Sequence, residues 1–216
     1  VVGSRPLHGE LEAALADWKG VDAALLFTSG YTANLGVLTV FGGRDVVVFS
    51  DELNHASIID GCRLARATSR IYRHADLGHL AELLDERDEA DGPPIIVSDT
   101  VFSMDGDVAD LDGLVDLAAR YGALLVLDEA HAVMGPDLPA LDRVAPGLPV
   151  LRVGTLSKTL GSLGGFVAGP QPFIDLLVNA ARSFIFTTAT TPSDAAAALA
   201  ALEVLRSPEG DDLVGR

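Results

Sequence analysis

Cysteine and positive charge are both scarce in this chain. Its 216 residues contain one cysteine, Cys62, so no internal disulfide can form, and we expect a cytoplasmic protein. Lysine and arginine number 15 against 31 aspartates and glutamates, which gives a formal net charge of −16. A field of this sign repels nucleic-acid backbones and anionic lipid surfaces. We therefore expect neither nucleic acid nor a membrane as a partner.

Long hydrophobic runs are also missing. No apolar stretch reaches the roughly 18 residues that a membrane-spanning helix needs, and no basic start precedes an apolar segment as in a signal peptide. What is present suits a globular core, with 49% hydrophobic and 21% charged residues. The chain begins at Val1 rather than at a methionine, and we expect it to be part of a longer chain.

Short apolar runs alternate along the chain with segments of helical periodicity. The runs predict strands, and the periodic segments predict helices. The expected strands are residues 23–27, 46–49, 70–72, 95–97, 123–127, 149–155 and 166–168, and the expected helices are 6–18, 31–40, 56–66, 77–88, 111–121, 172–182 and 192–206. Strands that are apolar throughout are typical of a sheet with both faces covered. The sequence predicts an α/β fold with three layers, a mostly parallel sheet between two layers of helices.

Polar residues just after the expected strands are the candidates for a site, because ligands of open α/β sheets bind outside the carboxyl ends of the strands. These candidates are Ser29-Gly30-Tyr31, Asn54-His55, Ser103, Asp128 with His131, and Thr155 with Lys158. His74 and His79 have no companions at metal-ligand spacing, so we expect no metal.

The run Asp128-Glu129-Ala130-His131 has the spelling of a helicase box. That interpretation requires an upstream Gly-x-x-x-x-Gly-Lys-Ser/Thr loop to hold the nucleotide phosphates. The nearest candidate, residues 154–159, has a serine before its lysine and lies downstream. The sequence argues against a nucleotide-driven motor.

The same residues suit pyridoxal 5′-phosphate (PLP) better. This cofactor needs an amine for its aldehyde, a carboxylate for its pyridine nitrogen, and helix-start amides with hydroxyls for its phosphate. Lys158, Asp128, the start of the helix at Gly30, and Thr155 supply one of each.

Six motifs in continuous order resemble the PLP-dependent α-oxoamine synthases, a family with the aspartate-aminotransferase-like fold. Each motif is weak alone, and together they are specific. They are Thr28-Ser29-Gly30-Tyr31-Thr32-Ala33-Asn34, Asn54-His55-Ala56-Ser57, Val101-Phe102-Ser103-Met104-Asp105-Gly106-Asp107, Asp128-Glu129-Ala130-His131, Gly154-Thr155-Leu156-Ser157-Lys158 and Phe184-Ile185-Phe186-Thr187-Thr188.

The resemblance implies a role for each matching residue. Lys158 would bind the cofactor as a Schiff base and remove the α-proton of the amino acid. Asp128 would pair with the pyridine nitrogen, and His131 and Ser103 would contact the phenolic oxygen. His55 would stack on the ring and place the substrate. The remaining implied contacts are to the phosphate: the amides of Gly30 and Tyr31, Thr155, and Thr187 or Thr188 of a neighbouring subunit in a homodimer.

The reaction implied by the resemblance is the condensation of an amino acid with an acyl-coenzyme A or acyl-carrier-protein thioester, with loss of CO2. The motifs are most similar to members that join L-alanine to pimeloyl-coenzyme A and give 8-amino-7-oxononanoate, a biotin precursor. Glycine C-acetyltransferase and serine palmitoyltransferase activities stay open. So does a different class of function, a non-catalytic partner subunit with the same fold.

The resemblance also bears on domain organisation. Residues 1–216 correspond to the PLP-binding large domain, with residues 1–20 as its N-terminal helix. The family's N-terminal segment and C-terminal small domain have no counterpart in these residues. After His131 the family is usually rich in glycine, whereas residues 132–137 here are not, so we expect a different loop path.

Overall fold

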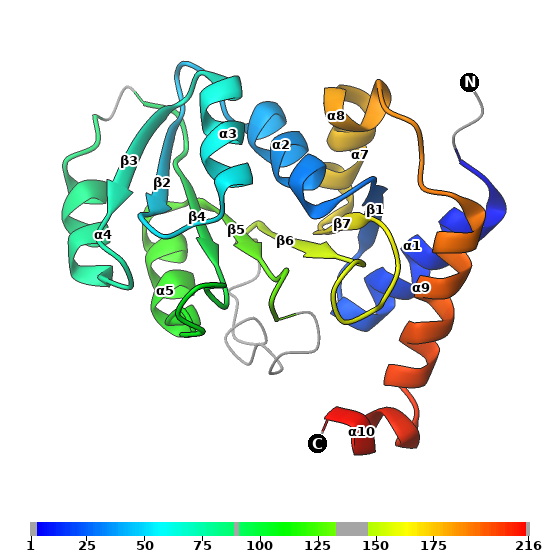
Figure 1. The fold of residues 1–216 in the computed structure, drawn as a ribbon. Coiled ribbons are helices and arrows are strands. Elements are labelled where there is room, and N and C mark those ends of the chain that lie inside the picture. Colours follow the sequence, from blue (N-terminus) through cyan, green and yellow to red (C-terminus); the bar gives the residue numbers. More distant parts are fainter. Residues whose placement is uncertain (1–3, 89–90, 133–146, 215–216) are drawn as a thin grey trace.

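A seven-stranded sheet forms the centre of the computed structural model, which describes residues 4–88, 91–132 and 147–214 (Figure 1). The strands are β1 (Ala23–Phe27), β2 (Val47–Asp51), β3 (Thr68–Tyr72), β4 (Ile95–Asp99), β5 (Leu124–Asp128), β6 (Val150–Thr155) and β7 (Gly165–Gly169). Their order is β1-β7-β6-β5-β4-β2-β3, and β7 runs antiparallel to both of its neighbours while the other pairs are parallel. The mostly parallel sheet predicted from the sequence is confirmed.

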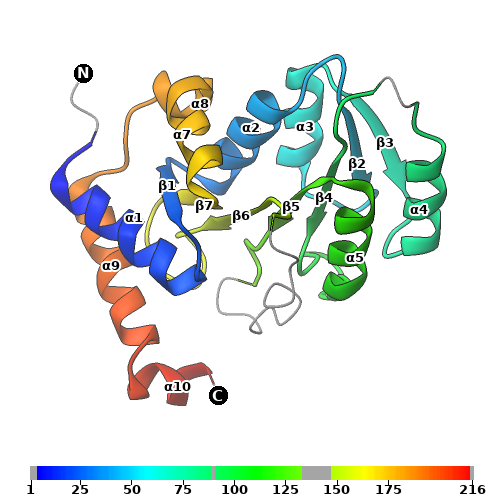
Figure 2. The same cartoon turned by 180° about the vertical axis from the view of Figure 1, so that it is seen from behind.

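Helices cover both faces of this sheet (Figures 1 and 2). They are α1 (Pro6–Lys19), α2 (Gly30–Phe41), α3 (Ala56–Ala65), α4 (Leu77–Asp85), α5 (Leu111–Tyr121), α7 (Gln171–Ala180), α8 (Arg182–Ile185), α9 (Pro192–Leu205) and α10 (Pro208–Val214). One face packs against α2, α3 and α7, and the other against α4 and α5 at one end and α1 and α9 at the other. The predicted three-layer architecture is confirmed.

Strand β5 shows why apolar strands fit between two helical layers. Its side chains alternate, so Leu124 and Val126 join the core under α2 and α3, while Leu125 and Leu127 join the core under α4 and α5. A strand of this kind has no polar face, because neither of its faces meets water.

Helix boundaries follow from capping residues. The side chains of Ser29, Asp76, Asp110 and Thr191 accept hydrogen bonds from amides in the first turns of α2, α4, α5 and α9. Helices α1 and α5 end at Gly20 and Gly122, which adopt the left-handed conformation that glycine tolerates best.

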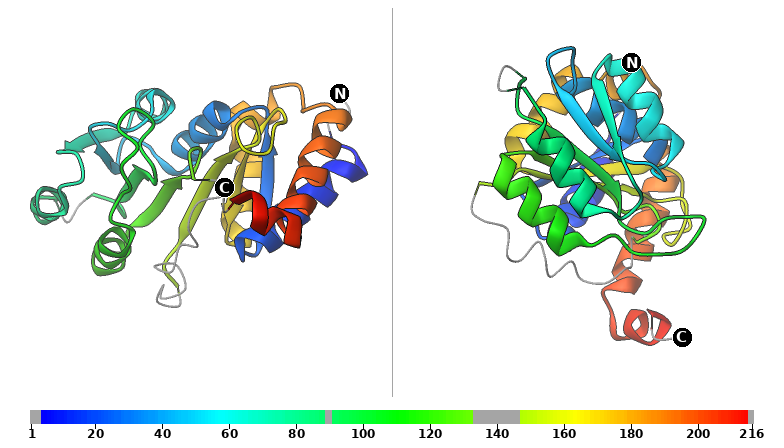
Figure 3. Two further views of the ribbon diagram at one scale, coloured as in Figure 1. Left: turned by 60° about the horizontal axis from the view of Figure 1, so that its bottom comes forward. Right: turned by 90° about the vertical axis from the view of Figure 1, so that its left-hand side faces the viewer.

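Some elements differ from the sequence prediction. Strand β3 is mostly exposed rather than uniformly apolar and buried, because it lies at the edge of the sheet with one neighbour only. The helix expected over residues 77–88 ends at Asp85, and the one expected over 172–182 breaks at Ala181 into α7 and α8. Helix α10 has no counterpart in the sequence prediction and lies beyond the end of α9, away from the sheet (Figure 3). No helix in the described ranges is long and apolar enough to cross a membrane.

Candidate active site

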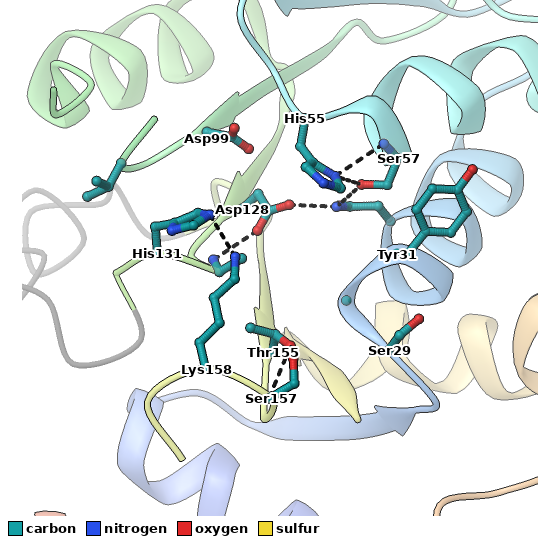
Figure 4. Close-up of a pocket in the computed structure, with 14 residues that line it drawn as sticks. Ser29, Tyr31, His55, Ser57, Asp99, Asp128, His131, Thr155, Ser157 and Lys158 are labelled. Carbon is teal, nitrogen blue, oxygen red and sulfur yellow. Dashed lines mark hydrogen bonds between the residues drawn. The ribbon is translucent and has the colours of Figure 1, made fainter. Parts of the chain in front are cut away.

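A pocket of about 200 Å³ opens at the carboxyl ends of β4, β5 and β6, where the first turns of α2 and α3 meet them (Figure 4). Parallel strands bring their carboxyl ends to one edge, which is why residues distant in sequence converge here. The lining consists of Ser29, Gly30, Tyr31, Asn34, His55, Ser57, Asp99, Val101, Asp128, Ala130, His131, Thr155, Ser157 and Lys158.

The N-terminus of α2 forms one wall of the pocket. Ser29 caps the helix, and the amides of Gly30 and Tyr31 belong to the first turn, where no intrahelical acceptor exists for them. Strand β7 passes this turn so closely that a Cβ on Gly165 would lie 2.4 Å from the Gly30 nitrogen. Glycine at position 165 therefore permits the helix start to sit against the sheet. The result is an anion-binding wall with a partial positive charge.

Asp128 lies at the floor of the pocket and is 5% exposed. Its Oδ2 accepts a hydrogen bond from Asn34 Nδ2 at 2.6 Å, and its Oδ1 accepts one from the Ala130 amide at 2.9 Å. Burial raises the pKa of Asp128, and these two hydrogen bonds oppose that rise. A cation entering the pocket would relieve the buried charge.

Asn34 connects Asp128 to His55. Besides its bond to the carboxylate, Asn34 Nδ2 donates to Ser57 Oγ at 2.9 Å, and Ser57 Oγ lies 2.7 Å from His55 Nδ1. The Ser57 amide also donates to this Nδ1, at 3.2 Å, so the hydrogen-bond network places the proton of a neutral His55 on Nε2. His55 is thereby held at the N-cap of α3 with its ring at the pocket.

Lys158 and His131 form a second pair. Lys158 Nζ lies 2.7 Å from His131 Nε2 (Figure 4). Partial burial lowers the pKa of Lys158, although the charges of Asp128 and Asp99 oppose this. Burial and the nearby Lys158 charge also lower the pKa of His131. The pair places an amine of reduced basicity beside a proton acceptor.

Asp99 joins the site although sequence reasoning did not single it out. It ends β4 beside Asp128, which ends β5, and the two are register partners. Burial, followed by the charge of Asp128, raises the pKa of Asp99 to about 8. Asn34 and Ser57 were also missed as separate residues. Their positions in the motifs around Gly30 and His55 were the available signal.

The structure brings most of the predicted site residues together. Gly30, Tyr31, His55, Asp128, His131, Thr155 and Lys158 all line the pocket. Thr155 Oγ1 donates to the Gly164 carbonyl at 3.1 Å and lies 2.8 Å from Ser157 Oγ, which adds a second hydroxyl to this wall.

Three predicted residues lie apart from the others. Ser103 is exposed at the tip of the turn that follows β4, and Val101 of the same segment lines the pocket instead. Thr187 and Thr188 are exposed and are absent from the lining. Most of the expected unusual loop after His131 lies outside the described residues, which omit 133–146. Among the described residues, no three His, Cys, Asp or Glu side chains cluster as metal ligands would.

Comparisons with known proteins agree with this arrangement. The chain is 52% identical over 214 residues to the 8-amino-7-oxononanoate synthase of Anaeromyxobacter sp. (strain K), an alignment that covers 95% of this chain and 52% of that protein. A serine palmitoyltransferase from S. paucimobilis with a bound PLP–myriocin aldimine superposes with a TM-score of 0.87 at 33% identity, over 95% of this chain and 54% of that one. The 8-amino-7-oxononanoate synthase of Francisella tularensis superposes with a TM-score of 0.80 at 29% identity, over 97% and 61%.

The chain spans about half the length of the curated relatives it matches. The sequence profile of the family Aminotransferase class I and II, in contrast, matches residues 1–214, which is almost the whole chain. With the three-layer fold and the pocket at the carboxyl edge of its sheet, the chain belongs to the aminotransferase class I and II family.

Proposed function

We propose that the pocket binds PLP. The donor set fits this cofactor at each of its ends, because the first turn of α2 offers unpaired amides to a phosphate and Asp128 offers a buried carboxylate to a pyridine nitrogen. Lys158 supplies the amine that an aldehyde requires. In addition, the Oδ1 of Asn34, which lies in the pocket lining, is buried without a hydrogen-bond partner. The pocket keeps unused polar capacity for a ligand.

Each residue of the pocket takes a part in holding the cofactor. The amides of Gly30 and Tyr31 and the hydroxyl of Thr155 would bind the phosphate, while Asp128 would keep the pyridine nitrogen protonated. His55 would contact the ring face and His131 the phenolic oxygen, whereas Ser103 lies outside the pocket lining and takes no part in this arrangement. When bound, PLP supplies an electron sink for a carbanion at the α-carbon of an amino acid.

The protein's own groups would manage the protons. Lys158, with its lowered pKa, can take up a proton from the α-carbon at its Nζ, and His131 Nε2 at 2.7 Å can exchange that proton. Asn34 fixes the orientation of the Asp128 carboxylate through its 2.6 Å hydrogen bond. His55, held by Ser57, faces the space left for the substrate.

We further propose that the protein condenses L-alanine with pimeloyl-coenzyme A, or the corresponding acyl-carrier-protein thioester, and releases CO2 to give 8-amino-7-oxononanoate. The observation that carries this proposal is the conjunction of Lys158, His131, Asp128 and His55 in one pocket. Relatives named 8-amino-7-oxononanoate synthase, such as the one from Geobacter sulfurreducens at 49% identity, support the choice of substrates. The proposal includes a cytoplasmic homodimer in which residues 1–216 form the cofactor-binding large domain, with residues 1–20 as its N-terminal helix.

A second candidate is serine palmitoyltransferase activity. Solved serine palmitoyltransferases superpose at 33% identity, against 29% for the Francisella tularensis synthase. The condensation chemistry is the same, so the amino acid and the acyl chain distinguish the two.

A matrix of substrates tests the proposal. Alanine, glycine and serine are each offered with acetyl-, pimeloyl- and palmitoyl-coenzyme A, and release of the coenzyme A thiol and of CO2 is measured after PLP is added. We expect turnover with alanine and pimeloyl-coenzyme A, and no turnover by the Lys158→Ala variant. Turnover confined to serine and palmitoyl-coenzyme A would establish the second candidate. A full-length protein that binds PLP but turns over no pair would instead be the non-catalytic partner subunit.

A further inference from the structure

His74 lies between two carboxylates, outside the lining of the pocket. Its Nδ1 is 2.9 Å from Asp51 Oδ1, and its Nε2 is 2.6 Å from Asp107 Oδ2. The three residues come from three segments, because Asp51 ends β2, His74 lies between β3 and α4, and Asp107 lies in the hairpin that follows β4. We call this set the His74 bridge.

Both contacts of the His74 bridge require a protonated imidazole. A neutral imidazole has one N–H, so only one of its nitrogens can donate to a carboxylate while the other presents a lone pair. The Asp51 side chain is 1% exposed and already accepts the amides of Leu53 and Ala75, so its charge needs a cation close by. In agreement with this geometry, the hydrogen bonds to Asp51 and Asp107 raise the pKa of His74 against the effect of burial.

The other charged groups around the bridge do not change this conclusion. Glu52 accepts the backbone amide of His74, which adds negative charge beside it. Arg73, the neighbouring cation, is paired with Asp76 at 2.8 Å. His79, at the start of α4, accepts the Arg73 amide through Nδ1. Carboxylates therefore dominate the surroundings of His74.

The bridge holds a hairpin that reaches the pocket. Residues 101–108 form this hairpin, closed by pairing of Val101 with Val108 and by the Gly106 amide donating to the Phe102 carbonyl at 2.8 Å. The buried ring of Phe102 packs edge-on against His74, with ring centres 4.4 Å apart. Val101 lines the pocket.

Asp51, at the other end of the His74 bridge, is connected to the pocket wall that carries His55. Asp51 accepts the Leu53 amide through its side chain and the Asn54 amide through its carbonyl, and the next residue is His55. The bridge thus connects the segment that carries His55 to the hairpin that carries Val101 and Ser103.

We propose that His74 is a positioning residue whose protonated form fastens the 101–108 hairpin to the end of β2, and so sets the distance between the Val101 wall and the His55 wall of the pocket. Loss of the proton removes one of the two contacts and loosens the hairpin. The effect of the bridge on the hairpin is independent of the proposed function, whereas its effect on cofactor binding rests on that function.

Hydrogen exchange of the hairpin amides in the cofactor-free protein tests whether protonated His74 fastens the hairpin. Protection factors, which correct for the intrinsic pH dependence of exchange, are compared below and above the pKa of His74, which NMR of the imidazole supplies. We expect protection of the Phe102 and Gly106 amides, and of the Ala109 amide just after the hairpin, to fall about tenfold as His74 loses its proton, the size of one charge-assisted hydrogen bond.

Two variants sharpen this measurement. In Asp107→Asn the amide can accept from or donate to a neutral ring, so the hairpin should stay protected and its protection should no longer follow pH. His79→Gln is the matched control, since His79 lies nearby in the first turn of α4 and its hydrogen bonds within the described residues go to neither Asp51 nor Asp107; it should retain the pH dependence of the unaltered protein. Hairpin protection that ignores the titration of His74 would overturn the proposal, as would an imidazole pKa at or below the ordinary value near 6.5.

The affinity for PLP tests whether the His74 bridge positions the wall of the pocket. His74→Gln should weaken PLP binding severalfold at neutral pH and leave it little changed at a pH where His74 is already neutral, whereas His79→Gln should bind as the unaltered protein does. Hairpin protection could change with the protonation of His74 while PLP affinity does not. In that case the proposal that the bridge positions the pocket wall is wrong, and the bridge stabilises only the hairpin. If the protein binds no PLP at all, the proposed function fails while the exchange result still decides the bridge.

Discussion

At the residue scale, the main tension in the site is between two carboxyl groups that end adjacent strands. Asp99 and Asp128 are both buried, and the charge of Asp128 disfavours a second charge on Asp99. The pKa of Asp99 rises to about 8, so this side chain holds a proton at neutral pH, and Asp128, oriented by the Asn34 and Ala130 donors, is the group left to pair with a cation. That single carboxylate suits a cofactor with one protonated ring nitrogen.

The substitution Asp99→Asn should stabilise the cofactor-free protein, and the gain in stability should increase with pH. In the unfolded chain the carboxyl loses its proton near pH 4, but in the fold it keeps the proton up to about pH 8. The fold therefore binds a proton that the unfolded chain has lost, and the free energy of unfolding decreases as pH rises between these values. The Asp99→Asn variant would lack this penalty, so its advantage should be near zero at pH 4 and grow to about 5 kcal/mol at pH 8.5.

Urea unfolding across this pH range measures the difference. Asp116→Asn removes the same charge from an exposed position on α5 and serves as the control, with no such growth. An Asp99→Asn protein whose stability parallels that of the unaltered protein from pH 4 to 8.5 would show that Asp99 is ionised in the fold.

Asp128 could be predicted from the sequence, and Asp99 could not, for a physical reason. Asp128 belongs to a four-residue motif with His131, whereas Asp99 follows an apolar run with no partner nearby in sequence. What makes Asp99 part of the site is the pairing of β4 with β5, which is a property of the sheet. Ser103 shows the converse, because its motif is clear but the hairpin turns its side chain out to solvent.

At the scale of elements, the close approach of β7 to the start of α2 shapes the anion-binding wall of the pocket. A Cβ at position 165 would meet the Ser29 carbonyl carbon and the Gly30 nitrogen, each at 2.4 Å, and backbone atoms cannot move aside as side chains do. Because β7 is antiparallel to β1 and β6, this contact lies at the edge of the sheet where the parallel strands end.

Gly165→Ala should therefore destabilise the protein by about 2–3 kcal/mol and weaken PLP binding, because the amides of Gly30 and Tyr31 would be displaced. Gly9→Ala is the control: Gly9 is exposed within α1, a Cβ at this position would have no neighbour within 4 Å, and alanine there should stabilise the helix by about 0.5–1 kcal/mol. Urea unfolding and a PLP titration measure both effects. Equal stability and PLP affinity in Gly165→Ala and the unaltered protein would contradict this account of the wall.

The elements themselves were largely predictable because caps and apolar runs mark them locally. The antiparallel direction of β7 and the edge position of β3 were not, since both depend on strand order. Ala181, where the expected helix of residues 172–182 breaks, is neither proline nor glycine and gave no local signal. Its side chain is fully buried, so tertiary packing sets this break rather than local preference.

At the scale of the whole molecule, the excess of negative charge surrounds a pocket built to receive an anionic phosphate. The net charge of −16 opposes anions at long range, and the first turn of α2 overcomes this only at short range through its amides. Few lysine amines compete for the aldehyde of the cofactor. The sequence contains two lysines, Lys19 and Lys158, and Lys19 is buried with its Nζ 2.7 Å from Glu129 Oε2.

This scarcity of lysine makes one measurement decisive for the central claim that Lys158 holds PLP. The protein is incubated with PLP, treated with borohydride to reduce any imine between a lysine amine and the aldehyde, and digested for peptide mass spectrometry. We predict one cofactor per chain, attached at Lys158, with no label at Lys19 and none in Lys158→Ala. Label at Lys19, or an unlabelled Lys158 at saturating PLP, would contradict the account.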